Sequence, residues 1–118
     1  MSNNVKQHEW GTEVIWANKD NYCSKILIFN AHAKTPFFFH KQKEKTYFVN
    51  SGEFKIKYIN TKDGEIFEAP LVEGQTFDVP SLMPVCIEAV KEQSVLAEAS
   101  NGEYADDEYI VYKASLIK

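Results

Sequence analysis

Turn residues recur at short intervals along the whole chain, and this spacing limits the possible fold more than any other feature of the sequence. The segments between the turns are rich in valine, isoleucine, tyrosine and phenylalanine, which favour strands. Short strands separated by regularly spaced turns are typical of β-sandwiches and β-barrels. The sequence therefore predicts an all-β fold. The turn signals are "NKDN" at 18–21, "NSG" at 50–52, "NTKDG" at 60–64, "EG" at 73–74 and "SNG" at 100–102.

The segment "GEFKIKYIN" gives the clearest strand signal. Phe54, Ile56 and Tyr58 alternate with charged residues, and a period of two predicts one buried and one solvated face. The segment 24–30, "SKILIFN", is more uniformly apolar, as expected for a strand covered on both faces. The pattern of "EYADDEYIVYK" at 103–113 is ambiguous. Further strands are expected at 12–17, 34–40, 46–50, 65–70, 75–79, 84–89 and 94–99.

Composition and charge narrow the class of protein. The 118 residues, 44% hydrophobic and 14% aromatic, suit one packed domain over 1–118. The net charge of −4, with acids and lysines interspersed, provides no basic surface for nucleic acid. No apolar run is long enough to span a membrane, and the N-terminus lacks a signal-peptide pattern, so we expect a cytoplasmic protein. Cys23 and Cys86 have apolar neighbours and are expected to be buried free thiols.

Four segments, in order along the chain, resemble the cupins, and most closely the small barrel domain of type II mannose-6-phosphate isomerases, which is often fused to mannose-1-phosphate guanylyltransferases. They are "HEWGTEVIW" at 8–16, "KTPFFFHKQKEKTYFVNSGEFKI" at 34–56, "EGQTFDVPSLMPVCIEA" at 73–89 and "SNGEYADDEYIVYK" at 100–113. The resemblance covers nearly the whole chain. It implies a single cupin domain, a double-stranded β-helix (jelly-roll) barrel.

The metal-binding positions of that group fall on Phe38, His40, Lys45 and Val85 when the two sequences are anchored on the serine–glycine turn at 51–52. Only His40 keeps a ligand type. A metal site needs three or four nitrogen, oxygen or sulfur donors that converge, and an ammonium at position 45 would repel the cation. We therefore expect no metal and no other cofactor.

A shift of the register by one residue is the alternative. It would place Glu44 where the resemblance puts a carboxylate ligand. Such a shift would also turn Tyr47 and Val49 away from the barrel interior.

The residues expected to line the barrel interior are Phe38, His40, Lys45, Tyr47 and Val85, because side chains alternate along a strand. In the functional interpretation, His40 and Lys45 are a cationic pair that binds a small sugar-like or anionic ligand between aromatic walls. A desolvated lysine could also act as a base or as a Schiff-base nucleophile. In the structural interpretation, Lys45 reaches the barrel mouth to pair with an acid such as Glu44, and His40 is a core residue.

Other side chains are given structural roles. His8 and His32 are expected on the surface, and the segment 41–45, "KQKEK", is expected to be a solvated turn. Trp10 and Trp16 are expected to close one end of the barrel or to lie in a dimer interface. We expect a homodimer formed through the aromatic terminal segments, which also contain Tyr104, Tyr109 and Tyr112.

Three functions remain compatible with the sequence. The first is a cupin that binds a small sugar-like or anionic ligand without the metal chemistry that the resemblance implies. The second is an active sugar-phosphate isomerase or epimerase whose metal is held in an unexpected register. The third is a non-catalytic dimeric interaction module. The sequence assigns no catalytic residue, and whether the chain is an enzyme stays open.

Overall fold

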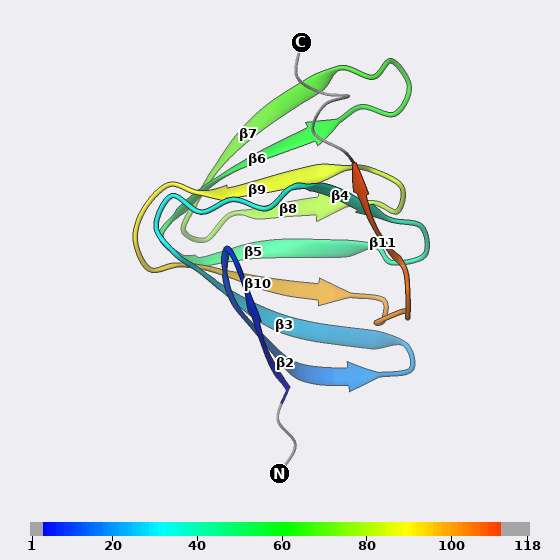
Figure 1. Cartoon of the computed structure of the whole chain (residues 1–118), viewed down its shortest axis with the longest axis horizontal. Helices are drawn as coiled ribbons and strands as arrows, with labels where there is room; N and C mark the ends of the chain where they lie inside the picture. Colours follow the sequence, from blue (N-terminus) through cyan, green and yellow to red (C-terminus); the bar gives the residue numbers. More distant parts are fainter. Residues whose placement is uncertain (1–3, 112–118) are drawn as a thin grey trace.

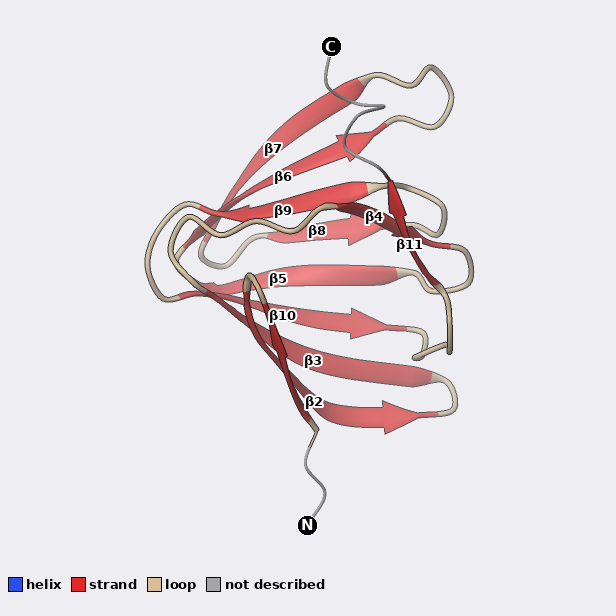
Figure 2. Ribbon diagram, in the orientation of Figure 1, coloured by secondary structure: helices blue, strands red, loops and turns tan. Residues whose placement is uncertain are grey.

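The computed structural model describes residues 4–111, which form two antiparallel sheets that pack face to face (Figures 1 and 2). The first sheet has the strand order β1-β2-β3-β10-β5-β8 and the second has the order β11-β4-β9-β6-β7. Within this range the chain forms no helix of the length and apolar character that a membrane crossing requires. The all-β jelly-roll prediction is confirmed.

The strands of the first sheet are β1 (Val5–His8), β2 (Gly11–Lys19), β3 (Tyr22–Phe29), β10 (Ser94–Ser100), β5 (Lys45–Ser51) and β8 (Thr76–Val79). Those of the second sheet are β11 (Glu108–Val111), β4 (Phe37–His40), β9 (Val85–Ala89), β6 (Glu53–Ile59) and β7 (Ile66–Val72).

The hydrophobic core lies between the two sheets and follows the period of two that the sequence predicts. Phe54 and Ile56 on β6 are buried, as expected, and they meet Tyr47 and Val49 on β5 and Leu96 on β10 within one cluster. Burying such side chains is the main stabilising contribution to a fold of this size. Cys23 and Cys86 are both buried and free, as predicted.

The turn at Gly52 passes the chain from the first sheet to the second. Gly52 has φ +82°, and a Cβ there would lie 2.3 Å from the Ser94 hydroxyl oxygen. Only glycine fits this conformation and this close approach. The turn fixes the register of β5 against β10, and with it the faces on which Lys45 and Tyr47 lie.

Two expectations about strands are wrong. The segment 24–30 is not covered on both faces, because β3 alternates between a buried Lys25 and an exposed Ile28. The expected strand 34–40 begins only at Phe37, and Lys34 forms an isolated bridge to Glu88. Neither β1 nor β11, each an edge strand of its sheet, has a clear signal in the sequence.

Candidate functional site

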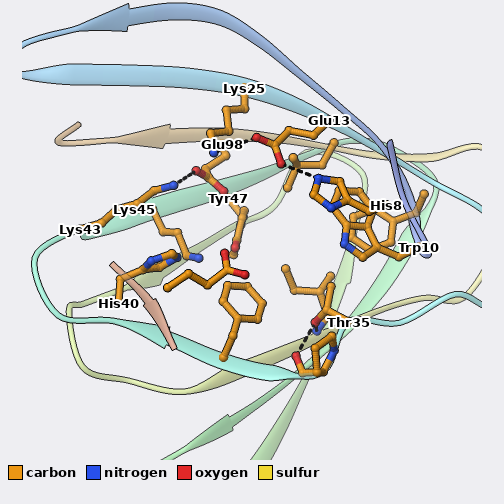
Figure 3. Close-up of a pocket in the computed structure, with 16 residues that line it drawn as sticks. His8, Trp10, Glu13, Lys25, Thr35, His40, Lys43, Lys45, Tyr47 and Glu98 are labelled. Atoms are coloured by element: carbon orange, nitrogen blue, oxygen red, sulfur yellow. Dashed lines mark hydrogen bonds and ion pairs between the residues drawn. The ribbon is translucent and has the colours of Figure 1, made fainter. Parts of the chain in front are cut away.

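A cavity of about 90 Å³ lies between the sheets (Figure 3). Four of the five predicted site residues line it: Phe38, His40, Lys45 and Tyr47. Val85 does not line it, because this side chain is fully buried in the core, on the strand next to Phe38. The predicted residues are therefore brought together, with Val85 behind the cavity wall.

Lys45 enters the cavity from the first residue of β5 and is 5% exposed. Its Nζ lies 4.4 Å from the centre of the Phe38 ring and 5.2 Å from that of Tyr47. Within residues 4–111 this ammonium has no hydrogen bond and no ion pair. Burial lowers the pKa of Lys45 to about 8, although the charge of Glu98 acts in the opposite direction. The group is a cation held by ring faces alone.

Lys45 does not reach the barrel mouth, and Glu44 is not its partner. Glu44 is exposed, and its backbone N–H donates to the Asn101 side chain, 3.1 Å away. Tyr47 and Val49 are buried with Lys45 on the inner face of β5. This arrangement excludes the one-residue shift that would turn Glu44 inward.

His40 ends β4 and lies 8% exposed beside the cavity. Its Nδ1 is 3.2 Å from the backbone oxygen of Asp107, so Nδ1–H donates to that carbonyl in the neutral ring. Burial, helped by the charges of Lys45 and Lys43, lowers the pKa of His40 to about 4. At neutral pH the imidazole is therefore uncharged and Nε2 is available as an acceptor. His40 is not part of a cationic pair, contrary to the functional interpretation of the sequence.

Tyr47 provides the third polar group of the cavity. The residue is 1% exposed, and its hydroxyl has no hydrogen-bond partner in the described part of the chain. Burial, with the charge of Glu98, holds the pKa of Tyr47 well above its usual range. The hydroxyl therefore stays protonated and can donate a hydrogen bond.

A network of ion pairs covers the cavity wall on the first sheet. Lys25 lies 3.0 Å from Glu13 and 2.8 Å from Glu103. Lys43 lies 3.1 Å from the same Glu103 and 2.8 Å from Glu98. These acids are therefore already paired with cations other than Lys45. Burial would raise the pKa of Glu98, but the surrounding lysines, Lys45 first, lower it to about 2.

One expectation fails at this network. The segment 41–45 is not simply a solvated turn, because Lys43 is 4% exposed and points inward to its ion pairs. His8 is exposed, as expected, and its ring stacks on Trp10 at 4.6 Å while its Nε2 lies 2.8 Å from Glu13. His32 is exposed, as expected.

Asp107 anchors the loop that carries Lys43. Its carboxylate accepts hydrogen bonds of 3.0 to 3.2 Å from the backbone N–H groups of Lys41, Gln42 and Lys43. These donors lower the pKa of Asp107, although burial acts in the opposite direction. The acidic run near the C-terminal end therefore contains a structural carboxylate.

The tryptophans have different surroundings. Trp10 lines the cavity and stacks on Phe29 at 4.4 Å, so it closes one end of the barrel as expected. Trp16 is 65% exposed on β2. Tyr109 stacks on Phe39, and the prediction for Tyr112 lies outside the described residues.

The residues at the expected metal positions do not fit a divalent ion. Phe38 and Val85 provide no donor, and Lys45 adds a positive charge next to His40. Across residues 4–111 no three histidine, cysteine, aspartate or glutamate side chains are grouped so that they could hold a metal ion. The absence of a bound metal remains a prediction.

Comparison of the chain with solved structures identifies its fold. The capsular polysaccharide assembling protein CapF from Staphylococcus aureus superposes with a TM-score of 0.81 at 18% identity, over 91% of this chain and 32% of that one. KdgF from Halomonas sp. has a TM-score of 0.74 at 18% identity, over 88% of this chain and 90% of that one. Oxalate decarboxylase from Bacillus subtilis has a TM-score of 0.81 at 15% identity, over 91% of this chain and 29% of that one.

These neighbours are cupin-fold proteins, and the chain has the cupin fold. It spans about a third of the CapF and oxalate decarboxylase chains. No protein-family profile and no curated protein matches the sequence. The finer resemblance to mannose-6-phosphate isomerases remains an expectation from the sequence.

Proposed function

We propose that this chain binds a small anionic, sugar-like molecule in its barrel cavity. The observation that carries the proposal is the Lys45 ammonium, which is buried without a hydrogen bond or an ion pair in the described part of the chain. A buried charge is costly unless it is paired. A ligand carboxylate would supply the missing partner.

The other free polar groups support an oxygen-rich ligand. Tyr47 can donate a hydrogen bond and His40 can accept one, so the same molecule could also present hydroxyl groups. The ring of Phe38 provides an apolar wall. The cavity of about 90 Å³ is smaller than the roughly 300–1,000 Å³ of sites for drug-sized ligands. The size favours a short-chain acid over a complete sugar ring.

The structural neighbours give background support to this proposal. CapF is named as a capsular polysaccharide assembling protein, and oxalate decarboxylase is named for a small dicarboxylate. At 15–18% identity they share the fold with this chain.

The test compares glycerate with glycerol, which differ by one carboxylate. Glycerate should raise the melting temperature of the protein at pH 7, because a ligand that binds only the folded state stabilises it. Glycerol at the same concentration should not. Lys45→Met should abolish the response, and Lys62→Met, at an exposed position, should keep it. A Lys45→Met variant that responds like the parent would refute the proposal, as would the lack of any response by the parent.

An interaction module is the second candidate, and one observation favours it. Apolar side chains line the outer face of the first sheet, and Trp16, Ile28 and Phe48 are 65%, 41% and 43% exposed. An exposed apolar face of this kind often marks an interaction site. We retain the proposal of a homodimer on this ground.

A further inference from the structure

Lys45 differs from the other two lysines that line the barrel cavity. Lys25 and Lys43 each form two ion pairs with carboxylates at 2.8 to 3.1 Å. Lys45 forms none with any described residue, and its neighbours are the ring faces of Phe38 and Tyr47. An ion pair holds a lysine in the charged form. Lys45 has no such pair, and burial disfavours its charged form.

The titratable groups around Lys45 come from five parts of the barrel. Burial is the largest cause that lowers its pKa, to about 8, and Lys43 and Lys25 act in the same direction. Glu98 on β10 and Glu108 on β11 raise it, and His40 on β4 is uncharged at neutral pH. Roughly a tenth of Lys45 is then the neutral amine at pH 7, against well under a hundredth for an ordinary lysine. The neutral amine is the nucleophilic form.

The two uncharged polar groups of the cavity complement an amine that attacks a carbonyl group. Figure 3 shows Lys45 and Tyr47 on β5 and His40 on β4 at the same cavity. The Tyr47 hydroxyl can donate to a carbonyl oxygen as negative charge develops there. Nε2 of His40 can accept the proton that the attacking amine releases. Neither group has another hydrogen-bond partner for this purpose among residues 4–111.

We propose that Lys45 forms a covalent imine with a small carbonyl compound bound in this cavity. The amine nitrogen bonds to the carbonyl carbon, the π electron pair moves to the carbonyl oxygen, and that oxygen takes up a proton. The resulting carbinolamine loses its hydroxyl group as water, with the proton that His40 accepted from the amine, and becomes a protonated imine. No oxidant or reductant is needed. The inference rests on the proposed function in using the same cavity and the same lysine.

The charge of the product defines the ligand further. A protonated imine keeps one positive charge where Lys45 had it, and the nearby carboxylate of Glu98 is paired with Lys43 at 2.8 Å. A ligand with its own carboxylate would neutralise that charge inside the cavity. The cavity of about 90 Å³ admits only a short chain. The ligand class is therefore a short 2-oxo acid.

The test uses pyruvate and sodium cyanoborohydride with the full chain at pH 7. Reduction of the imine would add one pyruvic acid minus one oxygen atom, and peptide mapping would place this mass on Lys45. We expect Lys45 to react roughly tenfold or more faster than the exposed Lys62, because the neutral fraction of its amine is larger. Lactate, which has no keto group, should give no adduct. Labelling of Lys45 no faster than that of Lys62 would overturn the inference.

The two proposals can fail separately. If glycerate stabilises the protein through Lys45 and pyruvate leaves no adduct there, the cavity binds anions and the imine is refuted. If the adduct forms at Lys45 and glycerate has no effect, anion binding without a covalent bond is refuted. The labelling is measured on the parent protein, so the result does not depend on the folding of a variant.

Discussion

Replacing the unpaired lysine of the barrel should stabilise this protein, whereas replacing a paired one should destabilise it. The two changes are Lys45→Met and Lys25→Met. Both residues lie on the inner face of the first sheet, at 5% and 6% exposure, and both changes replace an ammonium with a flexible apolar side chain. They differ in the partners that are left behind. The pair therefore isolates the effect of ion pairing from that of burial.

The gain for Lys45→Met follows from the pKa of the lysine. A pKa of about 8 in the fold against the ordinary 10.5 corresponds to about 3 kcal/mol of disfavoured charge at pH 7. In the variant, Glu98 loses its favourable interaction with the Lys45 charge, which contributes to lowering the pKa of Glu98. The ring contacts of the ammonium are also lost. We expect a net increase of about 1–3 kcal/mol in the free energy of unfolding.

Lys25→Met should act in the opposite direction. Its ammonium lies 3.0 and 2.8 Å from Glu13 and Glu103. Burial lowers the pKa of Lys25, but the charges of Glu98, Glu103 and Glu13 raise it above the ordinary value. Among residues 4–111, the change leaves the buried Glu13 with His8 as its one remaining ion-pair partner. Removing one partner of a buried ion pair costs about 3–5 kcal/mol. Because Glu103 is partly exposed, we expect the lower end of this range.

The assay is urea unfolding of the parent and both variants between pH 6 and pH 10.5. A lysine with a lowered pKa makes the folded state bind fewer protons than the unfolded state, so the parent gains stability as pH rises from about 8 to 10.5. The advantage of Lys45→Met should therefore be constant below about pH 7 and should shrink above pH 8. A destabilised Lys45→Met variant, or an advantage that does not change with pH, would refute the reasoning.

Four further predictions concern the site and the outer face of the first sheet. The pKa of His40 is lowered from 6.5 to about 4. Its contribution of about 3 kcal/mol to the free energy of unfolding is therefore present above pH 6.5 and lost as pH falls towards 4. The free energy of unfolding of His40→Gln should fall less steeply than that of the parent over this pH range. Asp107→Asn should lower the free energy of unfolding, measured in urea, by about 1–3 kcal/mol. It should also speed amide exchange at 41–43, because the carboxylate accepts hydrogen bonds from these backbone N–H groups; unchanged exchange would contradict this role. Elemental analysis of protein purified without chelator should find no stoichiometric metal; zinc, manganese, nickel or iron that is lost in His40→Ala would contradict this. Light scattering should give a dimer that Phe48→Glu weakens, and a monomer at high concentration would rule the dimer out.

The period of two along the strands was the most informative signal in the sequence. It placed Lys45 and Tyr47 on one face, and the glycine at position 52 fixed their register, since no larger residue fits against Ser94. Phe38 and His40 reached the same cavity by the same alternation on β4. These predictions depended on local pattern and turn geometry, which the sequence records directly.

The ion-pair network was missed because its members are far apart in the sequence. Glu98 is 55 positions from Lys43, and Glu103 is 78 positions from Lys25. A signal did exist: Lys25 and Glu98 each lie two residues from a buried leucine on their strands, at inward positions. Following the alternation through charged residues would have placed both inside.

Lys43 could not have been found in this way. It lies outside regular structure, and the backbone N–H groups of its loop are held by Asp107, more than sixty positions away. His8 was missed for a related reason, because β1 was not predicted as a strand and its hairpin brings the ring over the cavity. Charged residues next to turns are usually solvated, and tertiary contacts override that tendency here.

The charge pattern of the barrel argues for an anion as its occupant. In the metal-binding proteins that the sequence resembles, the equivalent positions carry donors around a cation, and a carboxylate is expected where this chain has Lys45. Here the cation belongs to the protein, and the neighbouring acids are bound to Lys25 and Lys43. Because the carboxylates near Lys45 are already paired with other lysines, an anion that enters the cavity would stabilise its buried charge most. This charge pattern supports our proposal that the cavity takes a negatively charged ligand rather than the metal cation that the sequence resemblance implies.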